Sequence, residues 1–107
     1  MSVILCLTDN DIERQISESE LPVLVDFFGD DCPPCERLAP IFQELAQDYR
    51  ERVVFAKLDT GENPLASSKL NIRGTPTLIL IKDGAVVDTI IGLRPKRELQ
   101  EWLDSAL

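Results

Sequence analysis

The chain has 107 residues, of which 44% are hydrophobic and 28% are charged. That length suits one domain, spanning residues 1–107, and the apolar content excludes an intrinsically disordered chain, because enough side chains can be buried to offset the chain entropy. Nineteen acidic residues against eleven basic ones give a formal charge of −8. A surface of that sign repels phosphate, so the composition disfavours nucleic-acid binding.

The N-terminal apolar stretch at residues 3–7 is followed at once by polar residues and lacks a basic leader, so it does not resemble a signal peptide. No apolar run approaches the roughly 18 residues that a membrane-spanning helix needs. We therefore expect a cytoplasmic protein without membrane contact. Structural disulfides are uncommon in that compartment, so the three cysteines indicate redox or metal chemistry.

The N-terminal third alternates strand-like and helix-like segments. Residues 3–7 read as a short strand, and Asn10, followed three residues later by Glu13, predicts the start of a helix that ends by residues 19–22. The apolar and β-branched residues at 23–28 predict a buried strand that contains a single carboxylate.

The middle of the chain repeats this alternation. Apolar residues at helical spacing predict a long amphipathic helix over residues 33–50. Residues 53–59 read as the next strand. Asn63 before Pro64 then predicts the N-cap and the first position of a short helix that ends near residue 70.

The C-terminal part begins with a hairpin. Residues 77–82 and 85–91 read as strands, and Asp83-Gly84 between them is typical of a two-residue turn. Pro95 opens a last helix with one apolar face. Because helices between the early strands imply parallel crossovers and the hairpin adds an antiparallel pair, the order predicts an α/β fold with a central mixed β-sheet flanked by helices on both faces.

Two of the cysteines form the motif Cys32-Pro33-Pro34-Cys35, between a predicted strand and a predicted helix. With Cys32 at the N-cap, the prolines occupy the first helical positions, where the N–H groups that they lack have no helical partner. The Cys35 N–H can then reach the Cys32 sulfur, and the helix dipole adds a modest stabilisation of a thiolate. We therefore expect Cys32, with its sulfur open to solvent, to be a nucleophile and Cys35 to be the resolving thiol.

Two other interpretations of this motif stay open. A zinc half-site would need two more ligands, and in a chain without histidine only Cys6 and carboxylates are left; a structural disulfide would be unusual in the cytoplasm. We expect no metal site. Cys6 itself, within an apolar stretch, is expected to be a buried, inert thiol, the alternative being a secondary oxidation or dimerisation site.

Several short motifs, in their order and spacing, resemble the thioredoxin family across the whole chain. They are Val25-Asp26-Phe27-Phe28, Cys32-Pro33-Pro34-Cys35, Leu38-Ala39-Pro40, the segment from Lys57 to Asp59, Gly74-Thr75-Pro76-Thr77, Asp83-Gly84 and Gly92. The resemblance implies the thioredoxin fold and a protein-disulfide oxidoreductase that acts as an electron carrier. It implies disulfide-containing protein substrates, a thioredoxin-reductase-like electron donor, no bound cofactor and a monomeric chain.

The same resemblance assigns further residues to the site. It implies that Asp26 is buried beneath the cysteine pair and accepts the Cys35 proton, and that Lys57 is its buried partner. Burial would raise the pKa of Asp26 and suit it to that role. The alternatives are a solvent-facing carboxylate on an edge strand for Asp26 and an ordinary exposed strand lysine for Lys57.

The resemblance also implies a substrate-binding surface. The peptide bond between Thr75 and Pro76 is expected to be cis, against the trans form that is commoner for such bonds. The Thr75 backbone then faces Cys32 and can pair with an extended substrate peptide, as in strand addition. Gly92 is expected to keep this surface flat, although an ordinary turn at the end of a strand explains it equally well.

The chain departs from the family's usual pattern beside the nucleophile. Phe28-Gly29-Asp30-Asp31 stands where an aromatic sequence ending in tryptophan is usual, and the two carboxylates oppose thiolate formation at Cys32. The middle dipeptide is Pro-Pro where Gly-Pro is usual. The leading expectation is a reductant of protein disulfides. Because the Pro-Pro centre leaves the redox potential undetermined, an isomerase or oxidant with a shifted potential is one alternative, and a thioredoxin-fold binding module that works without thiol chemistry is another.

Overall fold

The computed structural model describes residues 3–107, and its elements follow the order predicted from the sequence. The strands are β1 (Ile4–Cys6), β2 (Val23–Phe28), β3 (Val54–Asp59), β4 (Thr77–Lys82) and β5 (Ala85–Ile91). The helices are α1 (Ile12–Glu18), α2 (Pro33–Asp48), α3 (Pro64–Lys69) and α4 (Lys96–Ala106). The predicted bounds of β2, β4 and β5 are confirmed, while α2 ends two residues earlier than predicted.

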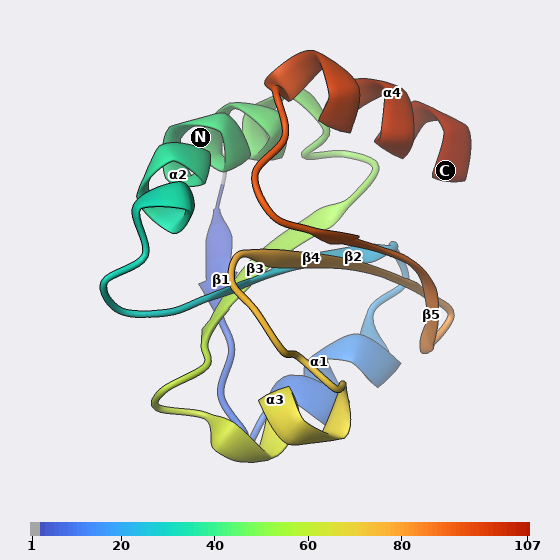
Figure 1. The fold of residues 1–107 in the computed structure, drawn as a ribbon. Helices are drawn as coiled ribbons and strands as arrows, with labels where there is room; N and C mark the ends of the chain where they lie inside the picture. The colour runs from blue at the N-terminus through green and yellow to red at the C-terminus, as the bar shows by residue number, and fades with distance from the viewer. Residues whose placement is uncertain (1–2) are drawn as a thin grey trace.

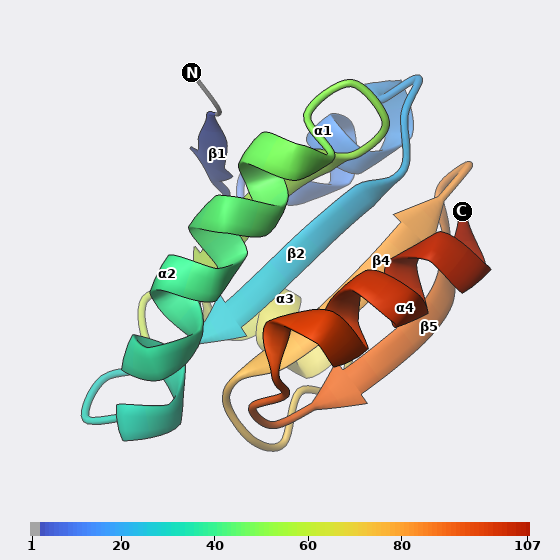
Figure 2. The same ribbon diagram turned by 90° about the horizontal axis from the view of Figure 1, so that it is seen from above.

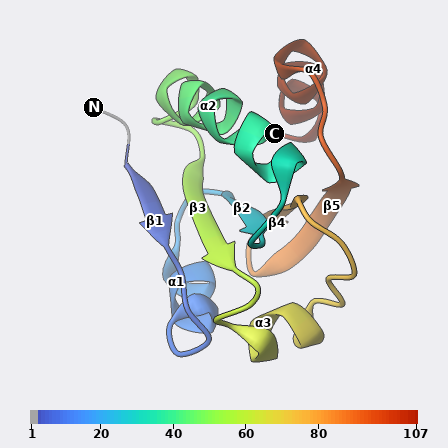
Figure 3. The same cartoon turned by 60° about the vertical axis from the view of Figure 1, so that its left-hand side comes forward.

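The strands form one mixed sheet in the order β1-β3-β2-β4-β5, with β1 and β5 at its edges (Figure 3). β3 pairs parallel with both β1 and β2, whereas β4 pairs antiparallel with β2 and with β5. The β4–β5 turn has positive φ at Asp83 (53°) and Gly84 (78°), which is the geometry that a two-residue hairpin requires. The predicted mixed sheet is therefore confirmed.

Helices cover both faces of this sheet: α2 and α4 lie on one face, and α1 and α3 on the other (Figures 1 and 2). Because successive side chains of β2 point to opposite faces of the sheet, they pack alternately against the two pairs of helices. Leu24 packs in the cluster with α2 and α4, whereas Val25 and Phe27 pack in the cluster with α1 and α3. Asp26, two positions after Leu24, therefore points to the face that α2 covers.

The first helix starts one residue later than the sequence predicts. Its N-cap is Asp11 rather than Asn10, and neither side chain caps it. The Asp11 carboxylate instead accepts a hydrogen bond from the Thr8 N–H at 2.8 Å, which closes the turn before the helix.

The helix α3 begins where the sequence predicts, but a distant side chain caps it. Asn63 is the N-cap residue, as predicted, but its side chain makes no capping bond. The carboxylate of Asp9 accepts from the N–H groups of Ala66 (2.7 Å) and Leu65 (3.2 Å), while the Asn63 amide oxygen accepts from the Asp9 N–H (2.9 Å). A residue more than fifty positions away thus provides the cap.

The last helix closes the α2 face of the sheet. On the predicted apolar face of α4, Leu99 and Leu103 are buried and Trp102 is half-buried against the same cluster. The Trp102 indole N–H donates to Asp88 on β5 at 2.8 Å. The phenol of Tyr49, just after α2, donates to the Asp104 carboxylate at 2.8 Å. Side-chain bonds therefore tie α4 to both the sheet edge and α2. None of the helices within residues 3–107 is long and apolar enough to cross a bilayer.

Candidate active site

The two motif cysteines form a disulfide at the N-terminus of α2. Cys32 is the N-cap residue (φ −124°, ψ 89°), and Pro33 and Pro34 occupy the first two helical positions, as the sequence predicts. The Cys35 N–H donates to the Cys32 sulfur at 3.2 Å, and the two Cα atoms are 5.2 Å apart. Because both sulfurs meet without unwinding of the helix, this turn can hold the cysteines as a disulfide or as a dithiol.

The pair is more covered than the sequence suggests. Cys32 is 8% exposed and Cys35 is 7% exposed, so the expectation of a sulfur lying open to solvent is wrong for the disulfide form. Thr75 contributes to this cover: its carbonyl oxygen lies 3.6 Å from the Cys32 sulfur, and its hydroxyl donates to that sulfur at 3.5 Å. Exposure therefore does not distinguish the two cysteines, and the difference between them lies in position: Cys32 is the N-cap residue and Cys35 lies within the first turn of α2.

Asp26 is buried within the sheet, with an exposed fraction of 6%. β2 lies between β3 and β4, so the alternative of an edge-strand carboxylate is wrong. Its Oδ1 atom has no hydrogen-bond partner. Burial raises the pKa of Asp26 from 3.8 to about 7, and the opposing attraction of the Lys57 ammonium is the smaller effect.

A pocket of about 220 Å³ lies between this carboxylate and Cys35. Asp26 and Cys35 both line it, together with Lys57 and Glu36. Its size admits water. The pocket therefore offers a route, direct or through water, by which a proton can pass between the Cys35 sulfur and the Asp26 carboxylate.

Lys57 stands beside Asp26 in the parallel register of β3 and β2, but its side chain is exposed. The expected burial of this lysine is therefore wrong. It lines the Asp26 pocket and also a neighbouring pocket that contains Cys6, and the ammonium reaches solvent at this end of the sheet. The positive charge of Lys57 lowers the pKa of Asp26, although by less than burial raises it.

Cys6 is a free and exposed thiol, so the expectation of a buried, inert cysteine is wrong. The physical reason lies in the sheet order. β1 is an edge strand that pairs on one side only, and Cys6 is its last residue, in register with the exposed Lys57. Apolar neighbours in the sequence indicated burial, but the edge position leaves this end of the strand uncovered.

The residues predicted to bind substrate lie together beside the disulfide. The bond between Thr75 and Pro76 is cis, as the family resemblance implied. The Gly92 N–H donates to the Pro76 carbonyl at 2.8 Å, which joins the end of β5 to this loop. Gly92 has a φ of +93°, a backbone region that glycine adopts without strain.

Gly29 also borders the site, and no sequence pattern predicted this position. A side chain at Gly29 would place its Cβ 3.3 Å from the Thr75 hydroxyl and 3.5 Å from the Thr60 hydroxyl. The segment after β2 therefore passes close to two loops that are distant in sequence. No local pattern signals such an approach, since glycine in a loop is common for many reasons.

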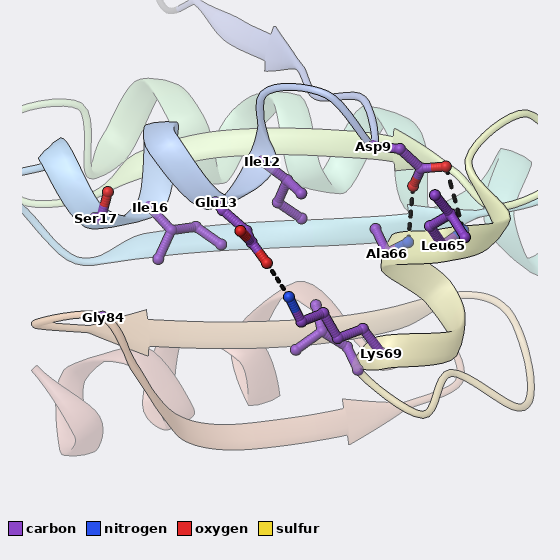
Figure 4. A pocket seen from close by; sticks show the side chains of 10 residues that line it. Asp9, Ile12, Glu13, Ile16, Ser17, Leu65, Ala66, Lys69 and Gly84 are labelled. Carbon is purple, nitrogen blue, oxygen red and sulfur yellow. Dashed lines mark hydrogen bonds and ion pairs between the residues drawn. The ribbon is translucent and has the colours of Figure 1, made fainter.

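A larger apolar groove lies away from the cysteines, between α1 and α3 on the opposite face of the sheet (Figure 4). It has a volume of about 480 Å³, and Ile12, Ile16 and Leu65 line it. The Glu13–Lys69 ion pair spans it, as Figure 4 shows. Within residues 3–107 no cluster of three or more potential ligand side chains is placed to hold a metal ion.

The amino-acid sequence is similar to known proteins over nearly its whole length. A family model described as Thioredoxin matches residues 3–105. Thioredoxin 1 of Synechococcus elongatus is 44% identical to the chain over 107 residues, the whole of both proteins, and Thioredoxin 1 of Nostoc sp. is 38% identical over the same span. Thioredoxin of Rickettsia bellii is 41% identical over 99 residues, which are 92% of this chain and 94% of that protein. The disulfide and the groups around it all lie inside the matched region.

Proposed function

The chain belongs to the thioredoxin family and is a protein-disulfide oxidoreductase, and on that premise we propose that it reduces protein disulfides with Cys32 as nucleophile and Cys35 as resolving thiol. The observation that carries this assignment is the Cys32–Cys35 disulfide at the N-terminus of α2, with the Cys32 sulfur at the N-cap accepting the Cys35 N–H. No bound cofactor is needed, because the two sulfurs carry both electrons.

The reaction has two exchange steps. The Cys32 thiolate attacks one sulfur of the substrate disulfide; that S–S bond breaks, a new one forms to Cys32, and the other substrate sulfur leaves as a thiolate. Cys35 then loses its proton and attacks the Cys32 sulfur. This second attack releases the remaining substrate thiolate and closes the Cys32–Cys35 disulfide, so two electrons pass to the substrate.

We propose that Asp26 takes the Cys35 proton in the second step. Its burial, the pocket it shares with Cys35 and a pKa of about 7 support this role, since a base is most useful when its pKa is near the working pH. Lys57 is proposed to assist by attracting the ionised carboxylate. A change of less than about twofold in turnover for Asp26→Asn would be too small for a proton-transfer role.

Substrates are proposed to dock as an extended segment along Thr75, Pro76 and Gly92. In this arrangement the Thr75 backbone pairs with the substrate peptide and holds its disulfide over Cys32. Pro33 and Pro34 complete the active-site loop. The short distances from Thr75 to the Cys32 sulfur support this placement.

The compartment proposed for this protein follows from its proposed role in reducing disulfides. A reductant of protein disulfides works in a reducing compartment, so we propose a cytoplasmic monomer that a thioredoxin-reductase-like donor re-reduces. We further propose that residues 1–107 form a single domain, of which residues 1 and 2 lie outside the described part of the chain.

Trapping tests the assignment. A Cys35→Ser variant should accumulate mixed disulfides with substrate proteins at Cys32, because the resolving thiol is gone, and mass spectrometry of the linked peptide locates the bond. The double variant Cys32→Ser, Cys35→Ser should lose reduction of insulin disulfides. If the double variant keeps its full effect on partner proteins, the chain acts as a binding module; if the wild type oxidises or reshuffles thiols in preference to reducing disulfides, the proposed direction is wrong.

A further inference from the structure

Two donors point at the Cys32 sulfur: the Cys35 N–H at 3.2 Å and the Thr75 hydroxyl at 3.5 Å. A helix N-terminus ordinarily presents several free N–H groups to an anion. Here the first two helical residues are Pro33 and Pro34, which have no N–H, and the Glu36 N–H is already bonded to the Cys32 carbonyl. A thiolate at Cys32 therefore has few backbone donors, and the threonine hydroxyl gains importance.

The charges near Cys32 make such a donor more valuable. Asp30, Asp31 and Glu36 are the carboxylates nearest to Cys32 in the sequence, and all three are exposed. They oppose a negative sulfur, although solvent screens them. The charged side chains within five positions of Cys32, or lining the pocket beside Cys35, are Asp26, Asp30, Asp31, Glu36, Arg37 and Lys57, and Arg73 and Arg94 lie two positions from Thr75 and Gly92.

Gly29 provides the space in which the Thr75 side chain lies. A Cβ atom at position 29 would be 3.3 Å from the Thr75 hydroxyl and 3.7 Å from its methyl group. It would also be 3.5 Å from the hydroxyl of Thr60, which is held by its bond to the Phe28 carbonyl at 3.0 Å. The added atom would fit only if the Thr75 side chain moved by a few tenths of an ångström. The missing side chain at Gly29 therefore keeps the hydroxyl beside the sulfur.

We propose that the Thr75 hydroxyl is a second hydrogen-bond donor to the Cys32 thiolate and that Gly29 is the positioning residue that keeps it there. This inference rests on the proposed role of Cys32 as nucleophile. The hydroxyl bond is strongest before attack, when the sulfur carries a full charge, and weakens as the new S–S bond forms. It therefore raises the thiolate fraction at neutral pH.

The size of the effect follows from two opposing consequences of a lower thiol pKa. A shift of about one unit changes the thiolate fraction about tenfold below the midpoint, while the intrinsic nucleophilicity falls about threefold, so the rate changes by roughly threefold. Thr75→Val, which keeps the shape and removes the hydroxyl, should raise the pH midpoint of Cys32 alkylation by about one unit and slow alkylation at pH 6.5 about threefold.

The experiment measures iodoacetamide alkylation of the reduced protein across pH, with the Cys32 peptide quantified by mass spectrometry. Thr75→Ser retains the hydroxyl and should keep the wild-type midpoint. Thr60→Val is the matched control, because it removes a hydroxyl that also borders Gly29 but does not touch the sulfur. An unchanged midpoint in Thr75→Val, or an equal shift in Thr75→Ser, overturns the proposal.

Gly29→Ala tests the positioning part. It should raise the midpoint in the wild-type background and add no shift in the Thr75→Val background; equal shifts in both would show that Gly29 acts by another route. Should Thr75→Val fail to fold, the comparison of Gly29→Ala with Thr60→Val decides the question, and equal midpoints in those two variants refute the proposal. Labelling that appears on Cys35 before Cys32 would overturn the assignment of the nucleophile instead, so the two failures are distinguishable; labelling of the exposed Cys6 is expected in every variant.

Discussion

Replacing Asp26 with asparagine should stabilise the oxidised protein, and the gain should grow as the pH rises. Asp26 is 6% exposed, its Oδ1 atom has no hydrogen-bond partner, and burial raises its pKa from 3.8 to about 7. The native state therefore holds the proton more tightly than the unfolded state. Below pH 3.8 the carboxyl is neutral in both states, and above pH 7 folding must bury a charge.

The magnitude follows from the distance between the two pKa values. A difference of about three units corresponds to a destabilisation on the order of 4 kcal/mol once the native carboxyl is ionised. The wild type loses this free energy of unfolding as the pH rises from about 4 to about 7, whereas an asparagine has no proton to lose. About 3 kcal/mol of the difference between Asp26→Asn and wild type should develop between pH 5 and pH 9.

Urea unfolding of the oxidised proteins at pH 5, 7 and 9 measures this difference, because the disulfide stays intact in both. Asp30→Asn provides the control: it makes the same chemical change in an exposed loop, where the carboxylate is solvated in both states. Its effect on the free energy of unfolding should be small and nearly constant with pH. The reasoning is refuted if Asp26→Asn shifts stability equally at pH 5 and pH 9.

Three further predictions concern single interactions. Asp9→Ala should destabilise the protein by about 1–2 kcal/mol, because the α3 N-terminus loses its cap; unchanged urea unfolding would mean that water replaces the carboxylate. Tyr49→Phe should lower the free energy of unfolding by about 1 kcal/mol, because the hydrogen bond to the Asp104 carboxylate is lost. Burial of the phenol and this bond raise the pKa of Tyr49 to about 12, so a phenolate absorbance change near pH 10 in the wild type would contradict that pKa. Asp30→Asn with Asp31→Asn should lower the pH midpoint of Cys32 alkylation by about half a unit, because two negative charges beside the sulfur are removed, and no decrease would refute the electrostatic argument.

Local chemistry accounts for what the sequence predicted correctly. Runs of apolar and β-branched residues placed β2, β4 and β5 at their bounds, and Asp83-Gly84 specified the hairpin turn. Two prolines after Cys32 fixed the start of α2 and brought the Cys35 N–H to the Cys32 sulfur. Each of these features depends on residues within about four positions of one another, so a short stretch of sequence is enough to predict it.

The errors share a different cause. Cys6 has an apolar neighbourhood in the sequence, yet β1 lies at the sheet edge and the thiol is exposed. Lys57 stands in a strand that is otherwise largely buried, yet its side chain reaches a pocket open to solvent. Both outcomes depend on which distant segments pair with the strand or pack over its end, and the residues near Cys6 and Lys57 in the sequence do not contain that information.

By itself, then, the amino-acid sequence determined the elements, the mixed sheet and the cysteine turn, because propensity, side-chain periodicity and capping act over a few residues. Only the tertiary structure decided that Asp9 caps α3, that the Asp26 Oδ1 atom has no hydrogen-bond partner, and that the Thr75 hydroxyl contacts the Cys32 sulfur beside Gly29. Apart from the short step from Gly29 to Cys32, these contacts join segments more than forty positions apart. Burial and distance at such points exist only after the strands have paired, so no local pattern encodes them.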